Sequence, residues 1–229
     1  MSTLTYRCDD PVSHYGPSPW KRPAVFFDRD GTLIEEHHYL NSISDIRILP
    51  GVLQGLRKLK FTGWPLYIIT NQAGVAHGYF SEKQLAEIHQ YLLHIFERHH
   101  IHFQGLFYCP HHPKSENSVY QRDCFGRKPK PGLILKAAEI DNLDLANSYV
   151  IGDKLIDIQA GKAGGTKTIL ILTGYGRNER LQITEFNHPD FIAGDFIQAV
   201  NWILKDWNQS RHRIFIEENQ SNYKRSGTI

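Results

Sequence analysis

Two aspartates, Asp28 and Asp30, stand directly after the apolar run AVFF, in the stretch FFDRDGT. If this run is a buried strand and the backbone turns at Gly31, both carboxylates can converge on one site. A carboxylate has a usual pKa of about 3.9, so at neutral pH it can attack phosphorus or bind a hard cation. Because Asp and Gly also favour solvated turns, this pair alone leaves an ordinary strand-end turn open as the alternative.

Two further polar clusters carry groups that suit a phosphate. Thr70, Asn71 and Gln72 follow the run LYII, and their hydroxyl and amide groups can donate to phosphate oxygens without adding charge. The loop GRKPKPG carries Arg127 and Lys128, and a lysine can offset the charge of a transferring phosphoryl group. Each cluster by itself also fits a loop opening or a solvated basic surface.

A fourth cluster lies in VIGDKLID, where Asp153 follows another apolar run and Asp157 comes four residues later. Asp153 can complete an oxygen-rich magnesium site with Asp28, because hard cations take carboxylate oxygens. We expect Asp157 to cap or brace the loop and not to bind the metal directly.

The segments that must position these clusters alternate between two patterns. One helical pattern begins at Ser81, with Gln84 as its capping-box partner. Three more helical patterns cover residues 52–59, 133–140 and 196–204. Buried strands are predicted over residues 24–27, 66–69, 106–108, 149–151 and 168–172. The alternation predicts an α/β, Rossmann-like three-layer fold with a central parallel sheet. Ligands bind such sheets at the carboxyl ends of the strands, where all four clusters fall.

The spacing of the clusters also limits what can cover the site. Only short segments separate Asp28 from Thr70 and Thr70 from Lys128, so we expect no large cap domain and an open site closed by loops. We expect an N-terminal extension over residues 1–22, one catalytic domain over residues 23–207, and a polar C-terminal tail over residues 208–229.

Composition indicates a single-domain protein of the cytoplasm. The 229 residues are 41% hydrophobic, and the net charge of +2 is too small to favour nucleic acid as the main partner. Three cysteines fit a reducing compartment. We expect a soluble protein, because no apolar run approaches the ~18 residues of a membrane span and there is no secretory signal. We expect a monomer, because no predicted helix has a surplus apolar face.

Taken together, the four clusters resemble the haloacid dehalogenase-like phosphatase superfamily, over roughly residues 24–174. The resemblance implies that Asp28 is the nucleophile of an aspartyl-phosphate mechanism and that Asp30 is its acid and base. It implies that Thr70 and Lys128 hold the phosphoryl oxygens. Magnesium would then be held by Asp28, Asp153 and the backbone carbonyl of Asp30.

Longer stretches are similar to the D-glycero-D-manno-heptose 1,7-bisphosphate phosphatases and to the related histidinol-phosphate phosphatases. They are TNQAGVAHGYF, FYCPHHP, CFGRKPKPG and GDKLIDIQAG. The resemblance implies that the 7-phosphate of a heptose bisphosphate is removed. The implied substrate-binding residues are Glu36, His37, His38, Tyr39, Asn71, Gln72, Arg127, Lys128 and Lys154. The chain departs from the family pattern at Glu36, His38 and His77. These departures leave the phosphatase chemistry intact but leave a related sugar bisphosphate or a different anomer open as the substrate.

The same resemblance implies a structural zinc site at Cys109, His111 and Cys124. The family pattern ends in Cys-x-Cys, whereas this chain has Gly126 at the last position, so the fourth ligand is missing. His112 or a water can substitute for it. Alternatively the loop binds no metal and holds two buried thiols and a histidine.

Three classes of function remain to be compared. The first is a phosphatase for a small phosphorylated sugar, with histidinol phosphate or another sugar bisphosphate as variants. The second is a polynucleotide 3′-phosphatase, which an open site can admit but for which the chain offers only a local basic cluster and a basic tail. The third, a non-catalytic scaffold, has no chemical need for all the residues named above.

Overall fold

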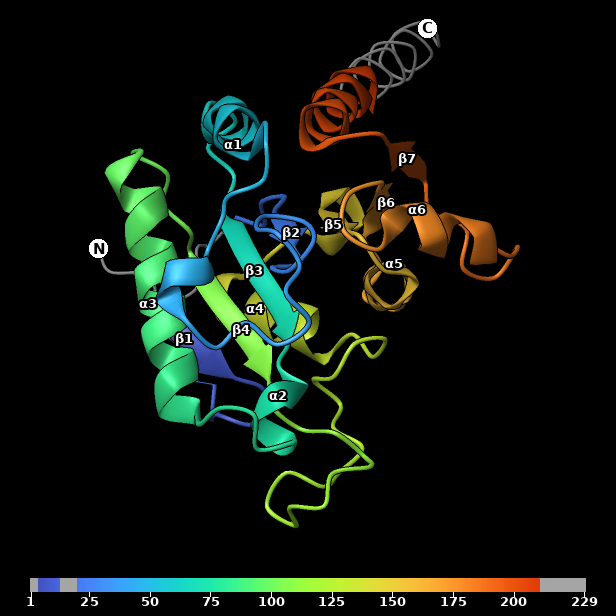
Figure 1. Cartoon of the computed structure of the whole chain (residues 1–229). Coiled ribbons are helices and arrows are strands. Elements are labelled where there is room, and N and C mark those ends of the chain that lie inside the picture. Colours follow the sequence, from blue (N-terminus) through green and yellow to red (C-terminus); the bar gives the residue numbers. More distant parts are fainter. Residues whose placement is uncertain (1–3, 13–19, 211–229) are drawn as a thin grey trace, which may run out of the picture.

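The computed structural model describes residues 4–12 and 20–210. Their strands form one parallel seven-stranded sheet in the order β1-β4-β3-β2-β5-β6-β7 (Figure 1). The strands are β1 (Leu4–Arg7), β2 (Val25–Phe27), β3 (Leu66–Asn71), β4 (Gly105–Cys109), β5 (Tyr149–Gly152), β6 (Lys167–Ile171) and β7 (Phe191–Ala193). Because β2 is the middle strand, Asp28 leaves the sheet at its centre.

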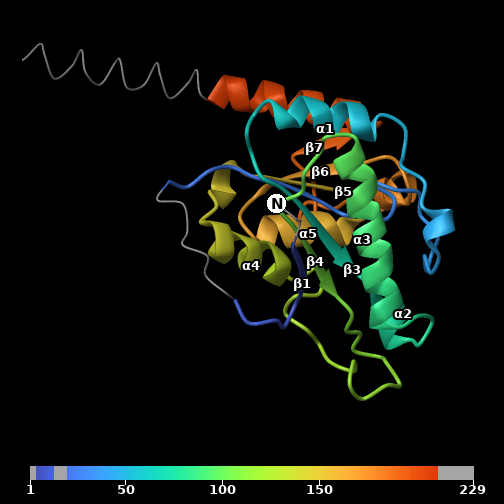
Figure 2. The same ribbon diagram turned by 90° about the vertical axis from the view of Figure 1, so that its left-hand side faces the viewer.

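Helices cover both faces of the sheet, which gives the predicted three layers (Figure 2). Alternate residues of a strand point to opposite faces, so Phe27 packs with α1, α3 and a helix over residues 196–210, whereas Phe26 packs with α4 and α5. The helices are α1 (Val52–Lys60), α2 (Ala73–Ala76), α3 (Glu82–Arg98), α4 (Gly132–Asp141), α5 (Leu155–Ala163) and α6 (Gly176–Glu179). Short 3₁₀ helices cover Ile43–Asp45, Leu145–Asn147 and Arg180–Gln182.

The apolar runs correctly predicted β2 to β6, and the helical patterns predicted α1, α3, α4 and the helix over residues 196–210. Two strands were not expected. β1 is a four-residue edge strand with exposed and half-buried side chains and has no continuous apolar run. β7 is apolar but only three residues long, Phe191–Ala193, and two of these residues are only half-buried. β1 lies within residues 1–22, expected as an extension, and pairs with β4. The expected polar tail lies mostly outside the described residues.

No segment within residues 20–210 forms a cap domain, in agreement with the cluster spacing. The irregular connection over residues 110–131 runs from β4 to α4 and carries Arg127 and Lys128 (Figure 1). In the part of the chain that the structure describes, no helix is both long and apolar enough to cross a membrane.

α3 buries a histidine that has no hydrogen-bond partner in the described residues. The helix begins with the predicted capping box of Ser81 and Gln84, and His89 is fully buried on its inner face. The His89 ring centroid lies 5.4 Å from that of Tyr108, and both ring nitrogens are unpaired within the described chain. Burial, helped by the positive charge of Arg29, lowers the pKa of His89 well below its ordinary value.

This buried imidazole makes stability depend on pH. Below a pH of about 6.5 the unfolded chain protonates His89 whereas the folded protein does not, so acidification favours unfolding by up to about 1.4 kcal/mol per pH unit. We expect His89→Leu to remove this part of the pH dependence. Urea unfolding at pH values of about 7.5 and 5.5 measures it, with His94→Leu, on the exposed face of the same helix, as the control. An unchanged pH dependence in His89→Leu would contradict the assignment.

Candidate active site

The carboxyl edge of the sheet holds a buried ion pair between Asp28 and Lys128. The Lys128 ammonium donates to Asp28 Oδ1 at 2.8 Å and to the backbone carbonyl of Ile69 at 2.9 Å. The same nitrogen lies 2.6 Å from Asp157 Oδ1. Lys128 is only 3% exposed, so a single cation is held between two carboxylates away from water.

A second feature of the site is an excess of negative charge. Burial alone would lower the pKa of Lys128, but Asp157 and Asp28 outweigh burial and raise it. Burial, with the charges of Asp28 and Asp157, raises the pKa of Asp153 to about 8. Burial also raises the pKa of Asp157, to about 6, although Lys128 opposes the shift. The positive charge of Lys154 opposes the rise in the pKa of Asp153 without cancelling it. A further cation would therefore stabilise the ionised forms of the three carboxylates.

The donor atoms of this group fit a hard divalent cation. Asp28, Asp153 and Asp157 place carboxylate oxygens within 4.8 Å of one another. Asp153 Oδ2 accepts from the backbone N–H of Tyr175 at 2.8 Å, whereas its Oδ1 is buried without a partner among the described residues. Asp157 Oδ2 accepts from the backbone N–H of Lys154, and its other oxygen faces the buried ammonium. Asp28 and Asp153 therefore remain the better ligands, and Asp157 braces the loop as expected.

Two glycines allow the chain to close around Asp153. Gly31 and Gly174 both have positive φ values, of +75° and +47°. A Cβ atom on either residue would lie 2.2 Å from Asp153 Oδ2. Any side chain at these positions would displace the carboxylate, so the glycines are required by both backbone conformation and space.

Asp30 is held beside the ion pair by two neighbouring side chains. Arg29 donates to its carboxylate at 2.9 to 3.1 Å, and Gln72 Nε2 donates to its Oδ2 at 3.1 Å. The Gln72 amide also donates to Thr70 Oγ1 at 2.8 Å. Gln72, expected as a substrate ligand, thus links Asp30 to Thr70 in the described structure.

Asn71 holds the backbone of the lysine loop. Its Nδ2 donates to the carbonyl of Lys128, and its Oδ1 accepts from the N–H of Lys128, both at 3.0 Å. Since both ends of the amide contact this backbone, the structure gives Asn71 a positioning role, and the expected substrate contact stays a prediction. The adjacent Arg127 donates to the backbone carbonyl of His111 at 3.1 Å, and burial lowers its pKa.

A pocket of about 340 Å³ opens at the same edge of the sheet. It is lined by Glu36, His38, Tyr39, Lys154, Tyr175 and Glu179. Lys154 pairs with Glu36 at 2.8 Å and lies 4.5 Å from the centre of the Tyr175 ring, whose hydroxyl is 2.7 Å from His38 Nδ1. His37 is exposed and does not line this pocket. Sequence reasoning missed Tyr175 and Glu179, because they follow β6 in a segment with no recognised motif.

Comparison with known proteins places this chain in a family. A family model described as HAD-hydrolase-like matches residues 125–199. The chain is 40% identical over 154 residues to a D-glycero-beta-D-manno-heptose-1,7-bisphosphate 7-phosphatase of Vibrio cholerae, over 67% of this chain and 83% of that protein. The chain belongs to the heptose-bisphosphate phosphatase family of the haloacid dehalogenase-like superfamily.

The chain is also similar to other heptose-bisphosphate phosphatases, in sequence and in structure. A D-glycero-beta-D-manno-heptose-1,7-bisphosphate 7-phosphatase of Haemophilus ducreyi is 41% identical over 155 residues, covering 67% of this chain and 85% of that protein. A crystal structure of the D,D-heptose 1,7-bisphosphate phosphatase of B. bronchiseptica, complexed with magnesium and phosphate, superposes with a TM-score of 0.71. Its sequence identity is 28%, and the match covers 80% of this chain and 99% of that one.

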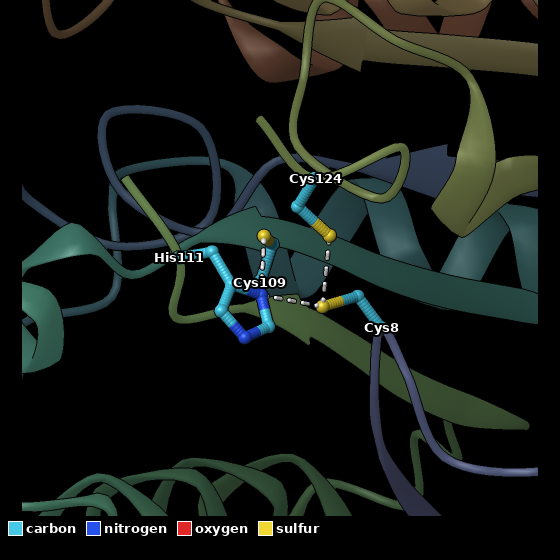
Figure 3. A group of neighbouring side chains, drawn as sticks. All are labelled: Cys8, Cys109, His111 and Cys124. Atoms are coloured by element: carbon cyan, nitrogen blue, oxygen red, sulfur yellow. Dashed lines mark hydrogen bonds between the residues drawn. The ribbon is translucent and has the colours of Figure 1, made fainter. Parts of the chain in front are cut away.

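The predicted zinc ligands of this family member lie together, and a fourth donor joins them. Cys109, His111 and Cys124 form a group with Cys8, and one donor atom from each lies within 4.8 Å of the others (Figure 3). The expectation that the fourth ligand is missing is therefore wrong as far as donor atoms are concerned. Spacing along the chain could not reveal Cys8, because it lies 101 residues before Cys109 and only strand pairing brings it close.

The Asn71 contacts generate a prediction for the family reaction. We expect Asn71→Ala to lower kcat about 10- to 100-fold with little change in KM, because a displaced Lys128 misaligns the reacting groups. Phosphate release from heptose 1,7-bisphosphate measures both constants. Asn201→Ala, which removes an exposed amide bonded to Lys58, is the control. A raised KM with unchanged kcat would instead show that Asn71 contacts the substrate.

Proposed function

We propose that this protein removes the 7-phosphate of D-glycero-β-D-manno-heptose 1,7-bisphosphate, leaving heptose 1-phosphate and inorganic phosphate. The observation that carries the proposal is the buried Asp28 carboxylate facing the Lys128 ammonium, with Asp30 held beside them. A carboxylate, a cation and a second carboxyl group are the parts needed for phosphoryl transfer through a covalent intermediate. The names of relatives at 40% and 41% identity support the same substrate.

Magnesium fits the oxygen-rich group described above. Asp28, Asp153 and the backbone carbonyl of Asp30 would hold it. When bound, the ion offsets the charge on the phosphoryl oxygens and on the nucleophile, which otherwise repel each other. Lys128 supplies a second, permanent positive charge from the protein.

In the first step, a carboxylate oxygen of Asp28 attacks phosphorus, and the bond from phosphorus to the sugar oxygen breaks. Asp30 donates its proton to that oxygen, so the sugar leaves as an alcohol. Lys128 and the Thr70 hydroxyl hold the phosphoryl oxygens during the transfer. Lys128 needs little rearrangement for this role, because its ammonium already contacts Asp28.

In the second step, a water molecule attacks the aspartyl-phosphate. Asp30, now a carboxylate, accepts a proton from the water, and the bond from phosphorus to Asp28 breaks to release phosphate. Both steps need the Asp30 carboxyl group within hydrogen-bond distance of the reacting oxygen, which is the sugar oxygen in the first step and the water oxygen in the second. Arg29 and Gln72 provide this constraint through their hydrogen bonds to its carboxylate.

The pocket beside the nucleophile suits the rest of a phosphorylated sugar. Lys154 and Arg127 supply positive charge for the phosphate that stays on the sugar. Lys154 now pairs with Glu36, so a substrate phosphate would compete for its ammonium. Exposed His38 and Tyr39 line the pocket with this pair and offer polar groups to sugar hydroxyls, whereas the expected contact of His37 lies outside the pocket lining.

The substrate is tested by phosphate release with magnesium present. We expect the β-anomer of heptose 1,7-bisphosphate to give the highest kcat/KM, ahead of the α-anomer, histidinol phosphate and fructose 1,6-bisphosphate. A 3′-phosphorylated oligonucleotide should react slowest, because the net charge of the chain is only +2 and its basic residues near the site form a local cluster at residues 127–130. Equal, weak activity on all compounds would contradict the heptose assignment while leaving the phosphatase proposal intact.

The covalent mechanism is tested by Asp28→Asn. We expect kcat to fall by at least about 10³-fold, because a carboxamide is a poor nucleophile. Thermal unfolding should change little, since Asp157 still pairs with Lys128. Asp206→Asn removes an acid paired with Lys167, which begins β6 at the amino end of the strands, away from Asp28. This control variant should keep full activity. Substantial turnover by Asp28→Asn would exclude the aspartyl-phosphate.

A further inference from the structure

Three sulfur atoms and one imidazole nitrogen meet between β1, β4 and the connection over residues 110–131. Cys8 Sγ lies 3.2 Å from His111 Nδ1 and 3.4 Å from Cys124 Sγ, and Cys109 Sγ lies 3.6 Å from the same nitrogen (Figure 3). The Cys8–Cys124 separation is far longer than a disulfide bond of about 2.05 Å, and all three cysteines are free.

These separations suit four ligands around one ion. Zinc takes thiolate sulfur at about 2.3 Å and imidazole nitrogen at about 2.0 Å in a tetrahedron, which places neighbouring donors about 3.5 to 3.8 Å apart. The observed contacts of 3.2 to 3.6 Å need only a small expansion to reach that geometry. Three soft sulfurs with one imidazole select zinc over magnesium or calcium, which prefer oxygen.

A second, independent observation explains why Cys8 is the fourth donor. Gly126 lies two residues after Cys124, at the position where the family pattern has its last cysteine. A Cβ atom built on Gly126 would lie 2.4 Å from Cys8 Cβ. The side chain of Cys8 therefore fills the space that a side chain at position 126 would need, and only glycine leaves room for it.

Charged groups surround the outer nitrogen of His111. With Nδ1 on a metal, Nε2 carries the proton and requires an acceptor. Asp9 Oδ2 lies 3.9 Å from Nε2, and Asp9 also pairs with Arg7 and Arg122, which contact Nε2 in this structure. A small shift of these guanidinium groups would free Nε2–H for Asp9. Their positive charge would offset the net −1 charge of three thiolates and one divalent ion.

We propose that Cys8, from the end of β1, supplies the fourth ligand of a structural zinc site with Cys109, His111 and Cys124, in place of a residue at position 126. The site fastens β1 to the connection that carries Arg127 and Lys128. β1 pairs with β4 over only four residues at the edge of the sheet, so the metal adds a cross-link that strand pairing alone does not provide. Such an ion would have a structural role, because Cys109 and His111 accept hydrogen bonds through their backbone carbonyls from Gln72 and Arg127 of the active site.

The test moves the ligand from the strand to the loop. We expect the wild-type protein to contain about one zinc ion per chain. Cys8→Gly removes one donor, and we expect its zinc affinity to be at least about 100-fold weaker than that of the wild type. The double variant Cys8→Gly with Gly126→Cys places a thiol on the loop after clearing its space, and should restore zinc content. Gly126→Cys alone should be destabilised, because its Cβ meets Cys8. Zinc is measured by chromogenic titration of the purified full chain in excess magnesium.

Cobalt substitution gives a readout independent of catalysis. Wild type and the double variant should show intense visible bands typical of tetrahedral cobalt with thiolate ligands, and Cys8→Gly should show weaker, shifted bands. Cys8→Ala, with Gly126 unchanged, controls for the flexibility that glycine adds and should also lose zinc. Undiminished zinc affinity and an unchanged cobalt spectrum in Cys8→Ala would overturn the proposal. So would wild-type protein that binds no zinc, or whose mass shows a Cys8–Cys124 disulfide.

Discussion

The buried pairing of Lys128 with Asp28 and Asp157 is the interaction on which the rest of the site depends. Removing an ammonium from water costs several kcal/mol unless carboxylates compensate for it, and Lys128 has two of them. The positive charges of Lys128 and Lys154 in turn reduce the repulsion among these carboxylates and Asp153. A divalent cation at these oxygens would reduce the repulsion further. That charge balance prepares Asp28 to meet an anionic phosphate.

The parallel sheet converts this charge balance into a defined geometry. Asp28 and Asp153 leave neighbouring strands β2 and β5 at the same edge, so their separation is set by strand pairing. Gly31 and Gly174 let the loops close on Asp153 without a clash. Lys128 comes from an irregular connection. Its backbone is held in place by two hydrogen bonds with Asn71, one donated and one accepted by the Asn71 amide.

The long connection over residues 110–131 also explains the use of the N-terminal strand. An irregular segment loses much conformational entropy when it is ordered, so it needs restraints along its length. Asn71 restrains its end beside the nucleophile, and the group of Cys8, Cys109, His111 and Cys124 restrains its start and middle. In the arrangement that we propose, β1 is part of the scaffold that orders the loop.

By itself, the sequence determined the α/β fold, the strands β2 to β6 and the acidic and basic clusters after them. These features are local, because apolar runs and strand-end carboxylates lie within a few residues of each other. The sequence did not reveal β1, β7, Tyr175 or the fourth donor of the cysteine–histidine group, Cys8. β1 is too short and too exposed to leave an apolar pattern, and Cys8 meets Cys124 only after 116 residues of chain have folded. Only the tertiary structure could decide which distant groups share a site, since that depends on strand order and packing and not on spacing along the chain.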